Sequence, residues 1–284
     1  MQNSNLKNLI WIASYPKSGN TWIRSILSAL LYTQDGLFDF GLLPKIDQFE
    51  KLENFKFIQN INNSDFKKLN KMNIVSKYWK EAQERVVSEE AVFFKTHSSN
   101  YNYNKLNYAN LNKTRGCIYI IRDPRDVVIS YSKFIGHSID ETINYMLGSN
   151  RQIWNQNKTI GIILSRWDFH VASWLNLDAP KMFIKYEDLL NNTKIILTEL
   201  TNFMQTTLKI QININKTKID NVIKTTSFDI LKKKEEKDGF NEASKKSRFF
   251  RSGKSQQWKN TLNLDQVKLL EKEFSQYMKK FNYL

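Results

Sequence analysis

Short apolar runs alternate along the chain with longer stretches in which apolar residues recur at helical spacing. Four runs rich in Ile, Phe, Val or Tyr have the composition of buried strands. They are residues 9–14, 91–96, 117–121 and 182–186. Helical spacing follows at residues 22–31, 124–134 and 188–204. Strands that alternate with helices predict an α/β fold with a mainly parallel central sheet flanked by helices, whose ligands bind at the carboxyl ends of the strands.

The rest of the chain is less regular. Residues 32–90 read as helices and loops inserted between the first two strands, and residues 265–281 return to amphipathic helical spacing. Residues 231–259 contain ten Lys or Arg against four acidic residues and few aliphatic ones. Such a segment has little core of its own, so we expect a mobile basic loop there. We treat residues 1–284 as one domain.

The first candidate site is the turn between the first strand and its helix, residues 14–22. Backbone amides at a helix N-terminus attract anions. Gly19 allows close approach of the backbone, Ser18 and Thr21 offer hydroxyl donors, and Lys17 adds a positive charge. The turn lacks the Gly-x-x-x-x-Gly-Lys-Ser/Thr spacing of nucleoside triphosphatases. An ordinary strand-to-helix turn is the alternative interpretation.

A second cluster follows the third strand. Pro124 suits the first position of a helix, which places Arg122 at the strand end and Ser130 about two turns into the helix. An Arg and a hydroxyl that converge in this way suit a terminal phosphate. A structural ion pair between Arg122 and Asp126 explains the same residues equally well.

The third cluster is Lys95-Thr96-His97, where the second strand ends. An imidazole at this edge of the sheet can accept a proton near neutral pH. A lone histidine is more often structural, and His170 illustrates that case. Because it shares a helical face with Trp167 and Trp174, we expect His170 in the core.

Composition narrows the classes of ligand. The net charge is +15, but 34 of the basic residues are Lys and 9 are Arg. Base-reading surfaces favour Arg, so we expect no nucleic acid as a partner and favour a small polyanion. No apolar stretch approaches the ~18 residues of a membrane span. The polar N-terminus lacks the features of a signal peptide, and Cys117 is the single cysteine. Together these features predict a cytoplasmic protein.

Taken in order over residues 9–260, these motifs resemble the sulfotransferases, cytosolic and bacterial, that use 3'-phosphoadenosine 5'-phosphosulfate (PAPS). The resemblance implies a P-loop-NTPase-like sulfotransferase fold, with PAPS as donor, adenosine 3',5'-bisphosphate (PAP) as product and no metal. It implies that residues 231–257 form a lid over the nucleotide. The implied nucleotide-binding residues are Lys17, Ser18, Gly19, Asn20, Thr21, Trp22, Arg122, Ser130, Tyr186, Thr226, Phe228, Phe250, Arg251 and Gly253.

The resemblance also assigns the chemistry. We expect Lys17 to stabilise the bridging oxygen as the phosphate leaves, Lys95 to bind the sulfuryl oxygens and His97 to act as general base on the acceptor. Phe134 matches a position that often faces the acceptor, and residues 136–161, with Tyr145 and Trp154, are expected to line its pocket. The acceptor class stays open: an alcohol, a phenol or an amine.

Four positions depart from the family pattern. Asn20 replaces a Thr in the loop. Ser252 stands where Lys is usual and Gln256 where Gly is frequent, so closure over the 3'-phosphate is expected to be weaker. Lys268 stands where the family's dimer motif needs a Glu, which predicts a monomer or a dimer of another kind. Two alternatives compete with this function: a nucleotide-dependent phosphotransferase or kinase, and a basic nucleic-acid-binding protein.

Overall fold

A five-stranded parallel sheet forms the centre of the computed structural model, with the strand order β2-β3-β1-β6-β9. The structure describes residues 6–58, 72–103, 106–149, 151–153, 159–243 and 248–284. The strands are β1 (Leu9–Ser14), β2 (Asp47–Gln48), β3 (Val92–Thr96), β4 (Asn102–Tyr103), β5 (Leu106–Asn107), β6 (Thr114–Ile121), β7 (Gln152–Ile153), β8 (Ile162–Ile163) and β9 (Lys181–Lys185). The sheet confirms the predicted α/β class and all four predicted strands.

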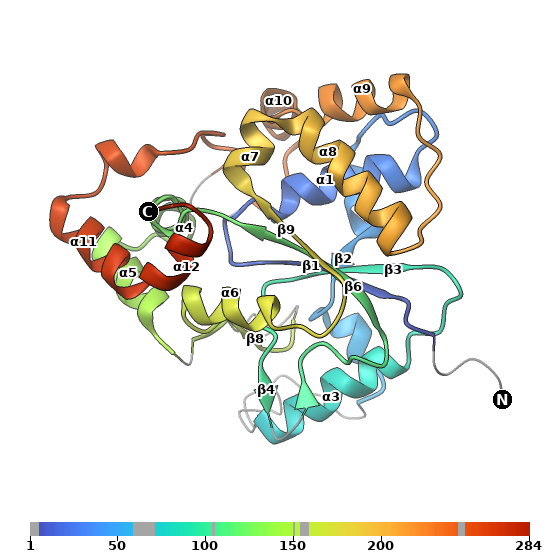
Figure 1. Cartoon of the computed structure of the whole chain (residues 1–284), viewed down its shortest axis with the longest axis horizontal. Helices are drawn as coiled ribbons and strands as arrows, with labels where there is room; N and C mark the ends of the chain where they lie inside the picture. Colours follow the sequence, from blue (N-terminus) through green and yellow to red (C-terminus); the bar gives the residue numbers. More distant parts are fainter. Residues whose placement is uncertain (1–5, 59–71, 104–105, 150, 154–158, 244–247) are drawn as a thin grey trace.

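Helices cover both faces of this sheet (Figure 1). They are α1 (Asn20–Tyr32), α3 (Met72–Glu84), α4 (Pro124–Ile135), α5 (Ile139–Leu147), α6 (Trp167–Leu175), α7 (Tyr186–Asn191), α8 (Thr193–Asn202), α9 (Lys216–Thr225), α10 (Phe228–Asp238), α11 (Leu264–Glu273) and α12 (Ser275–Lys280). Shorter helical turns are η1 (Phe40–Lys45), η2 (Leu52–Phe55), η3 (Phe203–Thr207) and η4 (Gln257–Asn260).

Alternate residues of β1 enter two different cores. Trp11 packs with α3 and α6 residues on one face, whereas Ile10 and Ile12 pack with α1, α7 and α8 residues on the other. All six residues of β1 are buried, because a parallel strand covered on both faces has no side exposed to water. This explains why residues 9–14 read as a continuous apolar run rather than an alternating one.

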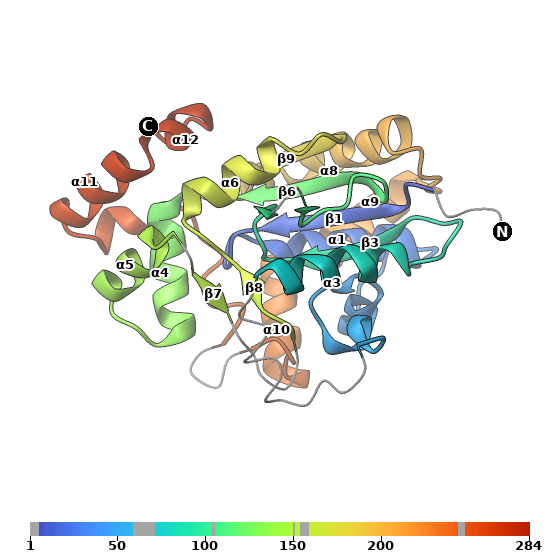
Figure 2. The ribbon, with the colours of Figure 1, turned by 90° about the horizontal axis from the view of Figure 1, so that it is seen from below.

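The carboxyl ends of the central strands meet at one edge of the sheet. Figure 2 shows β1 and β6 pointing toward α4, beyond which α5, α11 and α12 gather. Each candidate cluster follows one of these strand ends: residues 14–22 after β1, His97 after β3 and Arg122 after β6. Because parallel strands end at the same edge, the topology brings the three clusters together.

Arg125 ties the C-terminal helices to this edge. Its guanidinium pairs with Asp123, with Glu271 of α11 and with the carbonyl of Tyr283. It also lies 3.8 Å from the ring of Trp258. A buried guanidinium with several hydrogen-bonded partners fixes their geometry, so α11 and α12 are anchored beside the site.

The expectation of a loop is wrong for the first part of the basic segment. Residues 231–238 belong to helix α10, whose Leu231 is buried and joins the core with α1 and α9. Glu235 of the same helix accepts hydrogen bonds from the backbone amides of Phe249 and Phe250. Most charged side chains of this helix are exposed or half-buried, and its two buried residues are Leu231 and Glu235. The structure also contains an edge strand, β2, that its two polar residues did not reveal.

Candidate active site

The turn after β1 presents a helix N-terminus to the carboxyl edge of the sheet. Gly19 caps α1 with φ 106°, a backbone conformation that favours glycine. Ser18 and Thr21 are buried in this turn. The Asn20 side chain instead points inward, where its amide donates to the carbonyl of Ile12 at 3.0 Å and to Ser14 Oγ at 3.2 Å. Asn20 therefore stabilises the turn itself and offers a ligand only its backbone amide.

An aromatic side chain lies directly against the turn. A Cβ added to Gly19 would lie 2.8 Å from the Tyr186 ring, closer than real Cβ contacts allow. Tyr186 also packs edge-on against Trp22, with ring centroids 5.8 Å apart. The absence of a side chain at Gly19 thus lets the turn, Tyr186 and Trp22 form one compact unit.

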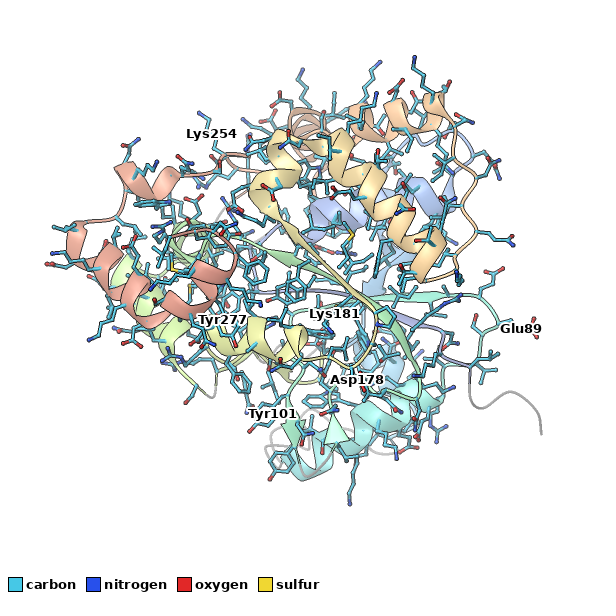
Figure 3. All side chains as sticks on the ribbon, viewed as in Figure 1. Glu89, Tyr101, Asp178, Lys181, Lys254 and Tyr277 are labelled. Carbon is cyan, nitrogen blue, oxygen red and sulfur yellow. The ribbon has the colours of Figure 1, made fainter. Side chains whose placement is uncertain are left out.

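Arg122 connects this turn to residues 251–260, which we call the C-terminal motif. Its Nη1 donates to the carbonyl of Lys17 at 3.2 Å, and its Nη2 donates to the carbonyl of Lys254 at 3.0 Å. Lys254 is labelled in Figure 3. The guanidinium lies over the Tyr186 ring at 4.2 Å, and its Nη2 lies 3.8 Å from Asp126. Arg122 therefore has the structural partner that the sequence suggested and also stands beside the anion-binding turn.

Ser130 and Thr226 are less closely tied to the turn. Ser130 lies on α4 and is partly exposed, and no hydrogen bond within the described ranges joins it to Arg122. Thr226 is buried and donates to the carbonyl of Val222. The predicted nucleotide roles of these two residues stay predictions.

The C-terminal motif folds back onto the same edge. A Cβ on Gly253 would lie 2.4 Å from the Phe228 ring, so this glycine also permits a close approach. Phe228 packs in turn against Phe250, with centroids 6.1 Å apart. Asp126 of α4 accepts the backbone amides of Gln256 and Trp258 at 2.7 and 3.1 Å. The motif is thus held by α4 and α10.

The structure shows the backbone conformation of Gln256 and the hydrogen bond of Ser252, two residues that depart from the family pattern. Gln256 adopts φ 58°, the left-handed conformation in which glycine is favoured. Ser252 donates to the Gln257 side chain at 3.0 Å, and Gln257 also accepts from Arg251. A serine thus takes part in local bonding where a lysine would add charge.

At the end of β3, the tautomer of His97 is set by its neighbours. His97 Nδ1 lies 2.8 Å from the carbonyl oxygen of Ser14. A carbonyl only accepts, so Nδ1 carries the proton and Nε2 keeps its lone pair. Burial and the neighbouring Lys95 hold the pKa of His97 well below its usual 6.5, so the imidazole is neutral at pH 7. The arrangement leaves Nε2 able to accept a proton.

His170 lies in the core, as predicted. Its Nδ1 lies 2.8 Å from the Tyr119 hydroxyl, and its Nε2 donates to the carbonyl of His97 at 3.1 Å. Burial lowers the pKa of His170 to about 3. This fully buried histidine therefore supports the backbone that carries His97.

Glu50 is a site residue that sequence reasoning missed. Its Oε1 accepts hydrogen bonds from Thr96, Ser98 and Tyr108, so one buried carboxylate fixes both neighbours of His97. Glu50 follows the two-residue strand β2, and only the sheet brings it beside β3. No local pattern in the sequence predicts the contact between Glu50 and the end of β3.

The electrostatics of the edge are dominated by crowded cations. Burial, followed by the charges of Arg122 and Lys95, lowers the pKa of Lys17 to about 8. Burial and Arg122 also lower the pKa of Arg251, and burial lowers that of Lys95. Cations that depress one another's pKa are stabilised by an anion placed between them. The Lys17 ammonium lies 4.4 Å from the Phe134 ring and 4.0 Å from the Phe249 ring.

The chain that builds this edge is similar to known proteins over nearly its whole length. The family model described as "Sulfotransferase domain" matches residues 7–282. The chain belongs to the sulfotransferase family. It is 21% identical to the amine sulfotransferase of Oryctolagus cuniculus, covering 96% of this chain and 81% of the relative. It is 26% identical to sulfotransferase 1B1 of Canis lupus familiaris, covering 90% and 79%.

Solved structures share the fold of this sulfotransferase. The mouse sulfotransferase SULT7A1 complexed with PAP aligns with a TM-score of 0.60 and 20% identity, covering 96% of this chain and 84% of the other. A retinol dehydratase in complex with androsterone and inactive cofactor PAP aligns with a TM-score of 0.61 and 17% identity, covering 98% and 82%. The predicted sulfotransferase fold is confirmed, and the family does not favour the kinase alternative.

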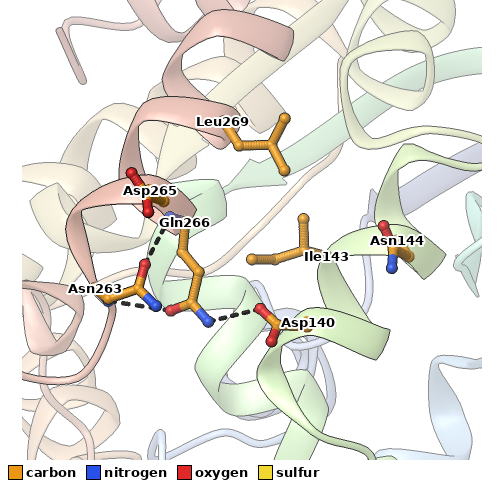
Figure 4. A pocket seen from close by; sticks show the side chains of 7 residues that line it. All are labelled: Asp140, Ile143, Asn144, Asn263, Asp265, Gln266 and Leu269. Atoms are coloured by element: carbon orange, nitrogen blue, oxygen red, sulfur yellow. Dashed lines mark hydrogen bonds between the residues drawn. The ribbon is translucent and has the colours of Figure 1, made fainter.

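A separate groove lies between α5 and α11 of this sulfotransferase (Figure 4). Its lining residues are Asp140, Ile143, Asn144, Asn263, Asp265, Gln266 and Leu269. Gln266 bridges Asn263 and Asp140 by hydrogen bonds. Two carboxylates and no cation line the groove, which makes it unsuited to an anionic donor.

The residues that the structure describes contain neither a candidate metal cluster nor a membrane-spanning helix. Among them, no group of three His, Cys, Asp or Glu side chains could hold a metal ion. Over the same ranges, no helix has the length and apolar character needed to cross a membrane.

The contact between Gly19 and Tyr186 is directly testable. Gly19→Ala should lower the free energy of unfolding by about 2 to 4 kcal/mol, because the new methyl group both disfavours the positive φ and overlaps the ring. In a Tyr186→Ala background the same change should cost at least about 1 kcal/mol less, since the overlap is gone. Urea unfolding of the four proteins measures both. Equal costs in the two backgrounds would show that the contact has no role.

Proposed function

We propose that this sulfotransferase transfers the sulfuryl group of PAPS to a hydroxyl or amine of a small acceptor, with His97 as general base. The proposal rests above all on the cation cluster of Lys17, Lys95 and Arg122 around a helix N-terminus, with a neutral imidazole beside it. A cytoplasmic location also remains our proposal, supported by the single, buried Cys117.

The donor set fits a nucleotide that carries phosphate and sulfate groups. Ser18 Oγ, Trp22 Nε1 and Arg122 Nε are buried and have no hydrogen-bond partner in the described part of the chain. Buried polar groups are normally paired, so unpaired donors beside an anion-binding turn are consistent with a ligand that pairs them. The mouse sulfotransferase SULT7A1 and the retinol dehydratase were both crystallised with PAP, which supports binding of the same nucleotide here.

PAPS, when bound, supplies an activated sulfuryl group and PAP as the leaving group. The protein then needs to orient the reactants and stabilise charge. We assign Lys17 to the oxygen that bridges sulfate and phosphate, and Lys95 to the sulfuryl oxygens. Arg122 and Ser130 would bind the 3'-phosphate, and Trp22 would stack on the adenine.

His97 completes the proton balance. The acceptor oxygen or nitrogen forms a bond to sulfur while the bond from sulfur to the phosphate oxygen breaks, and the acceptor proton passes to His97 Nε2. The hydrogen bond from Nδ1 to the Ser14 carbonyl fixes the ring. We assign the acceptor proton to Nε2 because this nitrogen keeps its lone pair.

The acceptor itself is proposed only by class. The names of relatives include an amine sulfotransferase, a 3-beta-hydroxysteroid sulfotransferase and a flavonol 3-sulfotransferase. Phe134 borders the Lys17 ammonium, and Tyr145 of α5 packs against Tyr131 of α4. Aromatic rings at this end of the site suit an apolar alcohol, phenol or amine. Trp154 lies outside the described residues.

We propose that residues 248–257, in the part of the basic segment that follows α10, form a lid over the nucleotide. Residues 248–257 carry Arg251 and Gly253 and contact α4 and α10 through a few hydrogen bonds to Asp126 and Glu235. Helix α10 itself is packed against the core, so it does not belong to the moving part.

The nucleotide role of Arg122 predicts a large loss of affinity. Arg122→Ala should weaken PAP binding by about 2 to 5 kcal/mol, because charge-assisted contacts to a buried phosphate are lost. Arg115→Ala, at the opposite end of β6, is the matched control and should bind PAP normally. Calorimetric titration measures both constants. Normal PAP affinity in Arg122→Ala would remove this residue from the site.

The base role of His97 predicts a loss of turnover rather than of binding. His97→Ala should lower kcat by roughly 10²- to 10⁴-fold, the usual contribution of a positioned base, while PAP affinity changes only a few fold. His170→Ala is the control: it should lower stability by about 2 to 4 kcal/mol through the cavity and the lost hydrogen bonds. Steady-state assays with a competent acceptor test this pair. Near-normal turnover in His97→Ala would assign the base elsewhere.

The lid predicts a local response to the nucleotide. Amide hydrogen exchange should slow at residues 248–257 when PAP is added, because an anionic ligand would add a charge-assisted contact to Arg251 beyond its hydrogen bond to Gln257. Helix α9, which lies in the core with α1, serves as the internal reference. Identical exchange at residues 248–257 with and without PAP would argue against a lid.

A further inference from the structure

The carboxylate of Glu242 reaches into the candidate active site from the segment after α10. Its Oε1 accepts from Arg24 Nη1 at 2.6 Å, and its Oε2 accepts from Thr21 Oγ1 at 3.0 Å. Oε2 also lies 3.8 Å from the Lys95 ammonium. Burial alone would raise the pKa of Glu242. The charges of Lys95 and Arg24 outweigh burial and hold this pKa well below its usual range. Glu242 is therefore a fixed negative charge at the cationic edge.

Two of these partners are groups that the proposed function assigns to the donor. Thr21 belongs to the anion-binding turn, and Lys95 is assigned to the sulfuryl oxygens. A threonine hydroxyl has one proton to donate. Thr21 Oγ1 can therefore donate a hydrogen bond to Glu242 or to an oxygen of PAPS, but not to both at once. A carboxylate and a phosphate or sulfate oxygen make the same kind of charge-assisted hydrogen bond. Glu242 thus resembles a donor anion supplied by the chain itself.

The third partner shows why the position needs an anion. Arg24 is buried, and its Nε and Nη2 donate to the carbonyls of Ile46 and Leu43. Its charge is paired with Glu242. A buried guanidinium that loses its carboxylate is strongly destabilising unless another anion takes that place. Arg24 and Thr21 lie three residues apart on α1, so both face the same anion.

The position of Glu242 in the chain also allows its side chain to move away from Thr21, Arg24 and Lys95. It follows Gly239, which ends α10 with φ 73° and whose added Cβ would have nothing within 4 Å. Its side chain keeps 29% of its surface exposed, in contrast to 2% for Arg24. A tethered group in a contact of this kind competes with a free ligand for the same partners.

From these contacts we propose that Glu242 occupies the Thr21, Arg24 and Lys95 cluster in the donor-free enzyme and that the 5'-phosphate, which PAPS and PAP share, displaces it. The contact stabilises the buried Arg24 in the absence of donor and limits donor affinity. This inference rests on the proposed use of PAPS. It assigns Arg24 to the anion-binding groups of the donor-bound enzyme, a role that its position on α1 did not reveal in the sequence.

Calorimetric titration with PAP tests the displacement. Glu242→Gln keeps the shape of the side chain but removes the charge, and should bind PAP about 10- to 100-fold more tightly, the equivalent of one charge-assisted hydrogen bond. Glu81→Gln, on α3 and in the exposed ion pair with Arg85, is the matched control and should bind as the native protein does. Unchanged or weaker PAP binding in Glu242→Gln overturns the proposal; if kcat also falls, Glu242 instead positions Lys95.

The titration distinguishes a wrong assignment of the donor from a wrong assignment of the displacement by Glu242. A native protein that does not bind PAP contradicts the proposed donor, whereas a native protein that binds PAP while Glu242→Gln binds no more tightly contradicts only the displacement. Should Glu242→Gln fail to fold because Arg24 is left unpaired, Glu242→Asp keeps the charge and shortens its reach. That variant should bind PAP a few fold more tightly than the native protein, and equal or weaker binding overturns the proposal.

Discussion

The site depends on a crowd of positive charges at the carboxyl edge of one parallel sheet. Lys17, Lys95 and Arg122 come from three different strand ends, and burial together with the charges of Arg122 and Lys95 lowers the pKa of Lys17 to about 8. Repulsion of this kind costs free energy in the folded protein, and an anionic ligand relieves it. Burial, together with the charge of Lys95, holds the pKa of His97 well below 6.5 and so keeps this imidazole neutral at pH 7.

Nearby carboxylates hold the backbone around these cations, and Asp126 also lies 3.8 Å from Arg122. Asp126 accepts the amides of Gln256 and Trp258, Glu235 those of Phe249 and Phe250, and Glu50 the hydroxyls around His97. Carboxylates bound in this way fix the loops without fully neutralising the site. Glu242 is the exception, because its partners are the site's own cations and hydroxyl.

The sequence was most informative where local pattern and structure coincide. Residues 9–14 form β1 with the predicted bounds, and the turn after it follows from Pro16, Gly19 and the helical spacing beyond. His170 was recognisable as core from its helical face. Contacts between distant segments were not visible: Glu50 reaches β3 only through the sheet edge, and Glu242 meets Arg24 218 residues away. Helix α10 was missed because its charge outweighs the few buried side chains that hold it.

The central claim is that the cation cluster exists to bind an anion, and the pH dependence of PAP affinity tests it most directly. Lys17 faces Arg122, Lys95, Glu242 and Glu235, and its pKa of about 8 in the free protein should rise when a phosphate binds beside it. Binding is then strongest while Lys17 is protonated and weakens as the pH rises through about 8. Titrations from neutral pH upward, where the phosphate charge is nearly constant, should show this weakening in the native protein and not in Lys17→Arg. Affinity that is independent of pH in the native protein, or that increases with pH, would contradict the account.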